Sequence, residues 1–180
     1  MGLSELFANN LLVKLLRGDN SRYELIASMV GTRLGDRVVV VGGGDGRLLA
    51  AVGAGTGLTG RTCAVEPDAD TAATVNTAAT ANGVLVEVEA APLDRLPYEP
   101  GSFDVAIATG ADTGGVAASL EEILRVLRPG GRCVIVAQVQ GRASQEPVEL
   151  LKRAGFRAAR LIAERSSLAF YEAVKSGQAA

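Results

Sequence analysis

The residues with the clearest chemical potential are three closely spaced glycines and an acid that follows them. Gly42, Gly44 and Gly46 come directly after the apolar run 38–41, and Glu66 lies twenty residues beyond the last of them. Glycine lets a backbone turn sharply and approach a ligand closely, and a helix beginning there offers unpaired N–H groups to a negative group. A carboxylate at the end of the next strand can accept both hydroxyls of a ribose. The pattern predicts a nucleoside cofactor site, with purely structural glycines as the alternative.

The glycine spacing also indicates which nucleotides do not belong there. The dinucleotide pattern is G-x-G-x-x-G, and Arg47 stands where its third glycine would be. Residues 55–60 do match that spacing, but they follow a predicted helix, and Thr80 rather than an acid lies twenty positions beyond Gly60. The sequence also lacks the G-x-x-x-x-G-K-[ST] motif of nucleoside triphosphatases. We therefore expect neither NAD(P) nor a nucleoside triphosphate.

The elements that position these residues alternate between strands and helices. Short apolar runs predict strands at 37–41, 61–66, 84–89, 103–108 and 131–138, and amphipathic or small-residue stretches predict helices at 46–52, 69–81, 116–127 and 145–154. Two further strand-like runs, 157–164 and 168–174, predict a C-terminal antiparallel hairpin. The expected fold is α/β: a doubly wound, Rossmann-like, mostly parallel sheet of seven strands.

The N-terminal region is predicted to be helical. Residues 3–16 carry leucines and a phenylalanine at helical spacing, and Ser21 with Glu24 forms a capping box that begins a second helix ending near residue 34. We therefore expect one domain over 1–180, with an N-terminal helical cap (1–34) on a Rossmann-like core (35–175). The first helix has three interpretations: a wall of the substrate pocket, a homodimer contact, or a membrane-surface helix. It lacks the basic polar face that is typical of membrane-surface helices.

Composition narrows the class of protein. The formal net charge is −2, so no basic field attracts nucleic acid, and no apolar run is long enough to cross a bilayer or to serve as a secretory signal. We expect a cytoplasmic protein without stable membrane insertion. The chain contains no histidine, which excludes a Ser-His-Asp triad and a histidine-ligated metal. Cys63 and Cys133 fall in predicted strands and are expected to be buried thiols rather than metal ligands.

Four stretches resemble class I S-adenosylmethionine-dependent methyltransferases, nearest to the group of ubiquinone and menaquinone C-methyltransferases. They are GGGDG at 42–46, AVEPD at 64–68, LPYEPGSFD at 96–104 and LEEILRVLRPGG at 120–131, in the family's order. The resemblance covers about residues 21–175. It implies the cofactor S-adenosylmethionine and a small-molecule substrate.

The resemblance also implies roles for individual residues. The methionine part of the cofactor would be held by the glycine loop, which consists of Gly42, Gly44, Asp45 and Gly46. The ribose would be bound by Glu66 and Pro67, and the adenine would lie against the backbone near Leu93. The transferred methyl group would be faced by Thr109 and the rest of 108–112. Asp45 either faces the cofactor's ammonium group or serves a tight turn. Asp112 and Tyr23 are the candidates for a catalytic base, and their alternative roles are a turn and a core or cap contact.

The chain departs from the family pattern at two positions and in the loop 109–115, which contains no aromatic and no distinctive catalytic residue. Val40 stands where the family usually has an acid, and Pro92 stands where an acid often contacts the adenine amino group. A second function therefore stays open: a catalytically degenerate, methyltransferase-like protein that serves as a cofactor-binding or partner subunit.

Overall fold

The computed structural model describes residues 21–42, 44–109 and 113–177. Its centre is a seven-stranded sheet with the order β3-β2-β1-β4-β5-β7-β6. The strands are β1 (Arg37–Val41), β2 (Arg61–Glu66), β3 (Glu87–Ala90), β4 (Phe103–Thr109), β5 (Leu127–Gln138), β6 (Arg157–Arg165) and β7 (Leu168–Val174). Strands β1 to β5 pair in parallel, and β7 pairs antiparallel with both β5 and β6. The predicted mostly parallel sheet with a C-terminal hairpin is confirmed.

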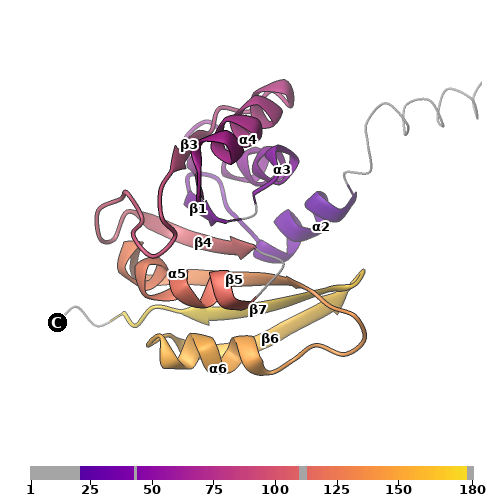
Figure 1. Ribbon diagram of the computed structural model, residues 1–180, viewed down its shortest axis with the longest axis vertical. Helices are drawn as coiled ribbons and strands as arrows, with labels where there is room; N and C mark the ends of the chain where they lie inside the picture. The colour runs from indigo at the N-terminus through magenta and orange to yellow at the C-terminus, as the bar shows by residue number, and fades with distance from the viewer. Residues whose placement is uncertain (1–20, 43, 110–112, 178–180) are drawn as a thin grey trace, which may run out of the picture.

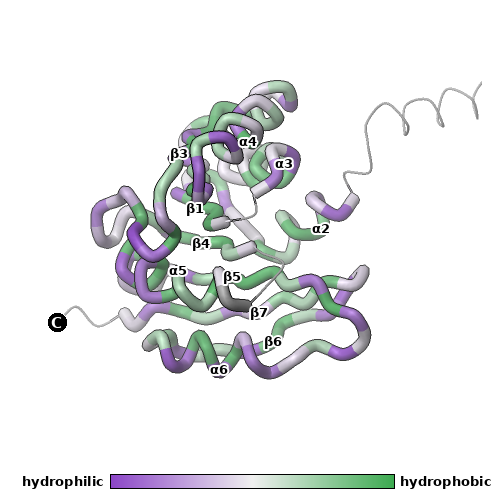
Figure 2. The backbone as a smooth tube through the Cα atoms, in the orientation of Figure 1, coloured by the Kyte–Doolittle hydropathy of each residue, from purple (hydrophilic) through white to green (hydrophobic). Residues whose placement is uncertain are grey.

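Helices cover both faces of this sheet (Figure 1). They are α2 (Ser21–Val30), α3 (Gly46–Thr56), α4 (Ala69–Ala81), α5 (Thr113–Val126) and α6 (Glu146–Arg153). Alternate residues of β1 enter two separate cores: Val38 and Val40 pack with α2, α3 and α4, whereas Val39 and Val41 pack with α5 and α6. This is the period of two expected of a strand buried on both faces. Figure 2 shows the hydrophobic residues running through β1 and β5 and alternating with polar ones along α6.

Helices α2 and α3 end about four residues away from their predicted ends, and glycines explain both differences. Helix α2 ends at Val30 rather than near residue 34, because Gly31 has a φ of 62° and its N–H closes the last turn on Ala27. Helix α3 continues to Thr56, past the predicted end at residue 52. Its end is set by Gly57, which has a φ of 66° and donates to the carbonyl of Gly53.

The terminal hairpin turns as its sequence predicts. Ser166 and Ser167 have φ angles of 51° and 59°, the left-handed pair that a two-residue hairpin turn requires. The helix predicted at 3–16 lies outside the described residues, so the proposed division into cap and core stays a prediction.

Gly46 is the point of closest contact between α3 and α4. A Cβ atom on Gly46 would clash with the backbone of Ala78 and Ala79, which belong to the small-residue helix. Replacing Gly46 with valine is expected to lower the free energy of unfolding by roughly 1–3 kcal/mol, because neither backbone can move away easily. Urea unfolding measures this loss. Ala50→Val on an open face of α3 is the control for helix propensity and should cost less than about 1 kcal/mol.

Both cysteines are fully buried. Burial raises the pKa of the Cys63 thiol to about 11 and that of the Cys133 thiol to about 12. Both side chains are therefore neutral, apolar members of the core at physiological pH, as the sequence predicts. Within the described residues, no group of three or more histidine, cysteine, aspartate or glutamate side chains is placed to hold a metal ion.

Candidate functional site

The glycine loop begins where three segments meet at the carboxyl end of β1. The N–H of Gly42 donates to the carbonyl of Val65 at 3.0 Å, and the Thr109 hydroxyl donates to the carbonyl of Gly42. Gly42 has a φ of 66°, a backbone conformation that favours glycine, and a Cβ atom there would lie 2.9 Å from the Leu93 side chain. The structure therefore brings Gly42, Leu93 and Thr109, predicted from separate parts of the sequence, into contact.

Glu66 places a carboxylate against this loop. It is the last residue of β2, its side chain is fully buried, and its Oε1 accepts a hydrogen bond from the Gly44 N–H at 2.9 Å. A Cβ atom on Gly44 would clash with that oxygen. A buried carboxylate at this position, against a glycine backbone with no side chain in the way, fits the ribose site that the sequence predicts.

Asp45 forms the N-cap of α3 and joins it to α2. Its Oδ1 accepts from the Arg47 N–H at 2.9 Å, which satisfies one unpaired donor of the helix end. Its Oδ2 accepts from the Tyr23 hydroxyl at 2.6 Å and from the Arg47 guanidinium at 3.0 Å. The same guanidinium donates to the Tyr23 hydroxyl at 3.0 Å and lies 4.7 Å from the centre of the Tyr23 ring. Tyr23, Asp45 and Arg47 therefore fasten the first turn of α2 to the first turn of α3.

These contacts fix the protonation of the two acids in the cluster. Partial burial alone would raise the pKa of Asp45, but the hydrogen bonds from Arg47 and Tyr23 outweigh it and hold the pKa at about 2. Burial and the adjacent Asp45 carboxylate raise the pKa of Tyr23. At neutral pH Asp45 is therefore ionised and Tyr23 keeps its proton, an arrangement that favours a positioning role for the tyrosine over a base.

The low pKa of Asp45 predicts a pH-dependent contribution to stability. A carboxyl whose pKa is lowered by folding stabilises the protein above its unfolded pKa of about 3.9, and this contribution is lost as the pH falls toward 2. Because the side chain is 36% exposed, we expect only about 1 kcal/mol at pH 7. Asp45→Asn keeps a good N-cap and removes the charge. Its deficit in urea unfolding should shrink between pH 5 and pH 2, and a deficit that stays constant over this range would contradict the assignment.

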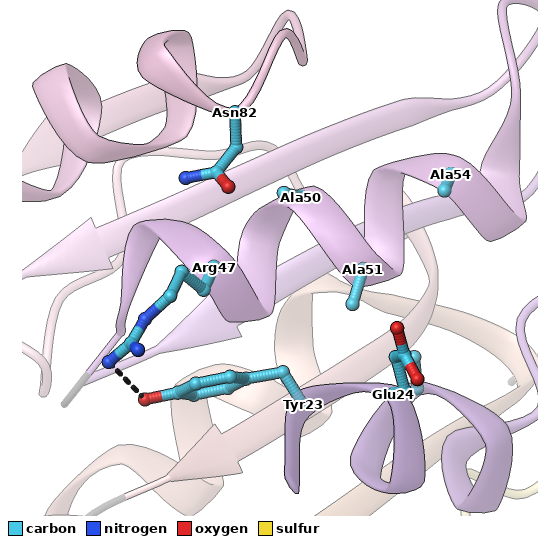
Figure 3. Close-up of a pocket in the computed structure, with 8 residues that line it drawn as sticks. Tyr23, Glu24, Arg47, Ala50, Ala51, Ala54 and Asn82 are labelled. Atoms are coloured by element: carbon cyan, nitrogen blue, oxygen red, sulfur yellow. Dashed lines mark hydrogen bonds between the residues drawn. The ribbon is translucent and has the colours of Figure 1, made fainter. Parts of the chain in front are cut away.

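A pocket of about 320 Å³ lies beside the Tyr23–Arg47 contact, and Figure 3 shows that contact with the alanines of α3 that line the pocket. Ala50, Ala51 and Ala54 of α3 and Asn82 after α4 line it, together with Tyr23, Glu24, Ala27 and Arg47. None of the predicted cofactor residues lines this pocket. This pocket is therefore separate from the residues that the sequence assigns to the cofactor.

Helix α2 also reaches the end of β5. The Arg22 guanidinium donates to the Gln138 side chain at 2.9 Å. The first turn of α2 is thus held at two points, by Gln138 and by Asp45, next to the carboxyl ends of the strands. This is the edge of a parallel sheet at which α/β proteins bind ligands.

The remaining predicted residues are placed as follows. Pro67 is exposed directly after β2, and Gly46 is buried in its contact with α4. Asp112 lies outside the described residues. Val40 is fully buried in the core. Glu122 and Arg125 lie in the stretch 120–131 that resembles the family, but the sequence assigned them no individual role; in the structure their side chains form an ion pair at 2.7 Å.

A mostly parallel sheet of this order, with a glycine loop and a buried acid at the ends of its first two strands, defines a Rossmann-like fold. The family model described as "Methyltransferase domain" matches residues 39–135, which is more than half of the chain. The chain therefore belongs to this family, and its predicted relation to class I S-adenosylmethionine-dependent methyltransferases is confirmed.

The relatives agree with this assignment. The ubiquinone/menaquinone biosynthesis C-methyltransferase UbiE of Chromobacterium violaceum is 30% identical over 108 residues, which are 59% of this chain and 44% of that protein. The chain thus spans less than half the length of this relative. The solved S-adenosylmethionine-dependent methyltransferase of Aquifex aeolicus superposes with a TM-score of 0.75 at 19% identity, covering 85% of this chain and 89% of the other. The [4+2]-cyclase SpnF superposes with a TM-score of 0.69 at 16% identity, covering 87% and 80%.

Proposed function

We propose that this chain binds S-adenosylmethionine at the glycine loop and transfers its methyl group to a small molecule. The observation that carries the proposal is Glu66, a fully buried carboxylate in contact with the backbone of Gly44. A carboxylate at the end of the second strand, beside the glycine loop, is placed to accept hydrogen bonds from the hydroxyls of a ribose. The ribose of the cofactor supplies two such hydroxyls.

In the proposed site, different residues around Glu66 contact different parts of the cofactor. The backbone of Gly42 and Gly44 would hold the methionine part, and the side chain of Leu93, which contacts the loop, would border the adenine. Glu66 accepts from the Gly44 N–H in the structure, so ribose hydroxyls would replace or share that hydrogen bond. Binding therefore requires the glycine loop and Glu66 to adjust together. Asp45, ionised and adjacent to the loop, can offset the positive ammonium group in the absence of an acid at position 40.

Methyl transfer requires little from the protein beyond aligning the acceptor with the methyl group. The sulfonium of the cofactor, when bound, supplies an activated methyl group, and correct placement of the acceptor then provides most of the acceleration. Tyr23 keeps its proton and fastens α2 to the glycine loop through Asp45. In our proposal it therefore positions the part of α2 that borders the methyl acceptor, and it does not act as a base. Asp112 stays the candidate for any base that the acceptor requires.

A small acceptor is supported by the charge of the chain and by the description of one relative. The net charge of −2 offers no field for nucleic acid. No helix in the described part of the chain is both long and apolar enough to span a bilayer. The relative from Chromobacterium violaceum is described as acting in quinone biosynthesis, which is compatible with a small organic acceptor but does not identify it.

Calorimetry with S-adenosylmethionine and S-adenosylhomocysteine tests the proposal directly. We expect a dissociation constant in the micromolar range for both ligands, with one site per chain. NADH serves as the control ligand, because Arg47 and the glycine spacing do not suit a pyrophosphate turn. Absence of heat at millimolar S-adenosylmethionine, or tighter binding of NADH, would overturn the proposal.

A second function is favoured by one observation, the apolar core residue Val40 at the position where the family usually has an acid. It is a non-catalytic subunit that binds the cofactor weakly or not at all. A shared fold alone does not decide between the two, because a cyclase has the same fold. The calorimetric experiment separates the enzyme from a subunit that has lost the cofactor, since such a subunit would bind S-adenosylmethionine only above the millimolar range.

A further inference from the structure

Helix α5 holds the segment 91–98 through a pair of charged side chains. The Arg125 guanidinium donates to the carbonyl of Tyr98 at 2.8 Å and to the carbonyl of Leu96 at 3.0 Å. The Glu122 carboxylate accepts from the N–H of Leu96 at 2.8 Å. The two side chains are themselves joined at 2.7 Å. Three backbone groups of one short segment are therefore bound by two side chains of a helix more than twenty residues away in the sequence.

This pair is unlike an ordinary ion pair on a helix surface. Such pairs contribute only a few tenths of a kcal/mol, because both charges stay in water. Here the side chains of Arg125 and Glu122 are 33% and 19% exposed. Their mutual hydrogen bond lowers the pKa of Glu122 and raises the pKa of Arg125, so both are charged at neutral pH. The charges strengthen the hydrogen bonds to the segment.

The other end of the segment is fixed at the cofactor site. The Ala91 N–H donates to the carbonyl of Glu66 at 2.9 Å, and the Leu93 side chain contacts Gly42. Leu96 itself is buried, with 3% of its surface exposed. The segment is thus anchored by β2 at its start and by α5 at its end, and Leu93 lies between the two anchors.

We propose that Glu122 and Arg125 are positioning residues for cofactor binding, which hold the segment 91–98 so that Leu93 forms the border of the adenine site. The inference rests on the proposed function, since it assigns adenine to this segment. It predicts that the two residues affect the nucleoside end of the cofactor although neither touches the glycine loop. Without the hydrogen bonds from Glu122 and Arg125, Leu93 can move relative to Gly42. Binding must then also order the segment, which makes the binding free energy less favourable.

The test compares two pairs of the same spacing. Arg125→Met keeps the length of the side chain and removes its donors, and Glu122→Gln keeps an acceptor for Leu96 while removing the charge. The matched controls are Lys152→Met and Glu149→Gln on α6, an i,i+3 pair at 2.8 Å whose side chains are 53% and 58% exposed. Each variant is assayed by calorimetry with S-adenosylhomocysteine, with adenosine, and by thermal unfolding.

We expect Arg125→Met to weaken S-adenosylhomocysteine and adenosine binding by the same factor, about tenfold, at a temperature where the variant is folded. Glu122→Gln should have a smaller effect in the same direction, and the α6 controls should bind like the wild type. Arg125→Lys should recover part of the affinity, because a lysine offers one charged donor group where arginine offers a fork.

The outcomes distinguish this inference from the proposed function. If the wild type binds neither ligand, the proposed function fails, and the assignment of Glu122 and Arg125 fails with it. If the wild type binds tightly and the Arg125 and Glu122 variants bind equally tightly while melting at lower temperature, the pair is only structural and this inference alone is overturned. Loss of affinity for S-adenosylhomocysteine without loss for adenosine would also overturn it, because the defect would then lie at the methionine end.

Discussion

Replacing Glu66 with alanine is expected to weaken S-adenosylmethionine binding by roughly ten- to a hundredfold. The variant removes a charged acceptor for the ribose hydroxyls, and hydrogen bonds to a charged group contribute about 1.5–3 kcal/mol. The Gly44 N–H also loses its acceptor in the free protein, so the glycine loop becomes less ordered before the ligand arrives. Calorimetry with the purified variant measures the change.

Two further variants make the result specific. Glu66→Gln keeps the size of the side chain and should lose less affinity than alanine, since one amide oxygen can still accept. Glu89→Ala removes an exposed carboxylate from the neighbouring strand β3 and should bind like the wild type. Equal affinity of Glu66→Ala and the wild type would remove Glu66 from the site and end the assignment of the ribose to this strand.

Deleting residues 1–17 is expected to leave a folded protein that has lost methyl transfer. All elements of the sheet and its covering helices lie within the residues retained, and α2 keeps both of its anchors, Arg22 on Gln138 and Tyr23 on Asp45. The deleted segment carries six leucines and one phenylalanine, each of which gains about 1.5–3 kcal/mol from burial. They must cover an apolar surface, and in our proposal that surface is a wall of the acceptor site beside the start of α2.

Circular dichroism, thermal unfolding, cofactor binding and sedimentation are compared for the truncated and complete chains. We expect the cofactor affinity to change little, because the glycine loop and Glu66 are retained. A truncated protein that transfers methyl groups at the full rate would contradict the wall. A dimer that becomes a monomer on truncation would assign the segment to a subunit contact instead.

The fold could be predicted from sequence because its signals are local. An all-valine run such as 38–41, bounded by glycines and followed by small residues, has few alternatives to a buried strand. Helix ends were less predictable. The end of α3 depends on a glycine with a left-handed conformation. The sequence has several glycines in this region, and tertiary packing determines which of them ends the helix.

The site was predictable where backbone and chemistry coincide in one motif. Gly42, Gly44 and Glu66 follow directly from strand, turn and strand. Gly46 has a packing role that the sequence did not indicate, because it lies against the backbone of α4, and its assignment to the cofactor stays a prediction. The hydrogen bond from the Arg125 guanidinium to the Leu96 carbonyl could not be predicted, because it joins residues 29 positions apart and depends on tertiary packing.

The burial of both cysteines has a practical consequence for spectroscopy. The chain holds only two thiols, both are fully buried, and the pKa values of about 11 and 12 leave almost no thiolate at pH 7.5. Because maleimide dyes react with exposed thiolates, the native protein should resist labelling while it is folded. A single cysteine introduced at Glu24, on the rim of the α2–α3 pocket, would then carry the dye alone. Its emission would follow α2 in real time without any change to the core.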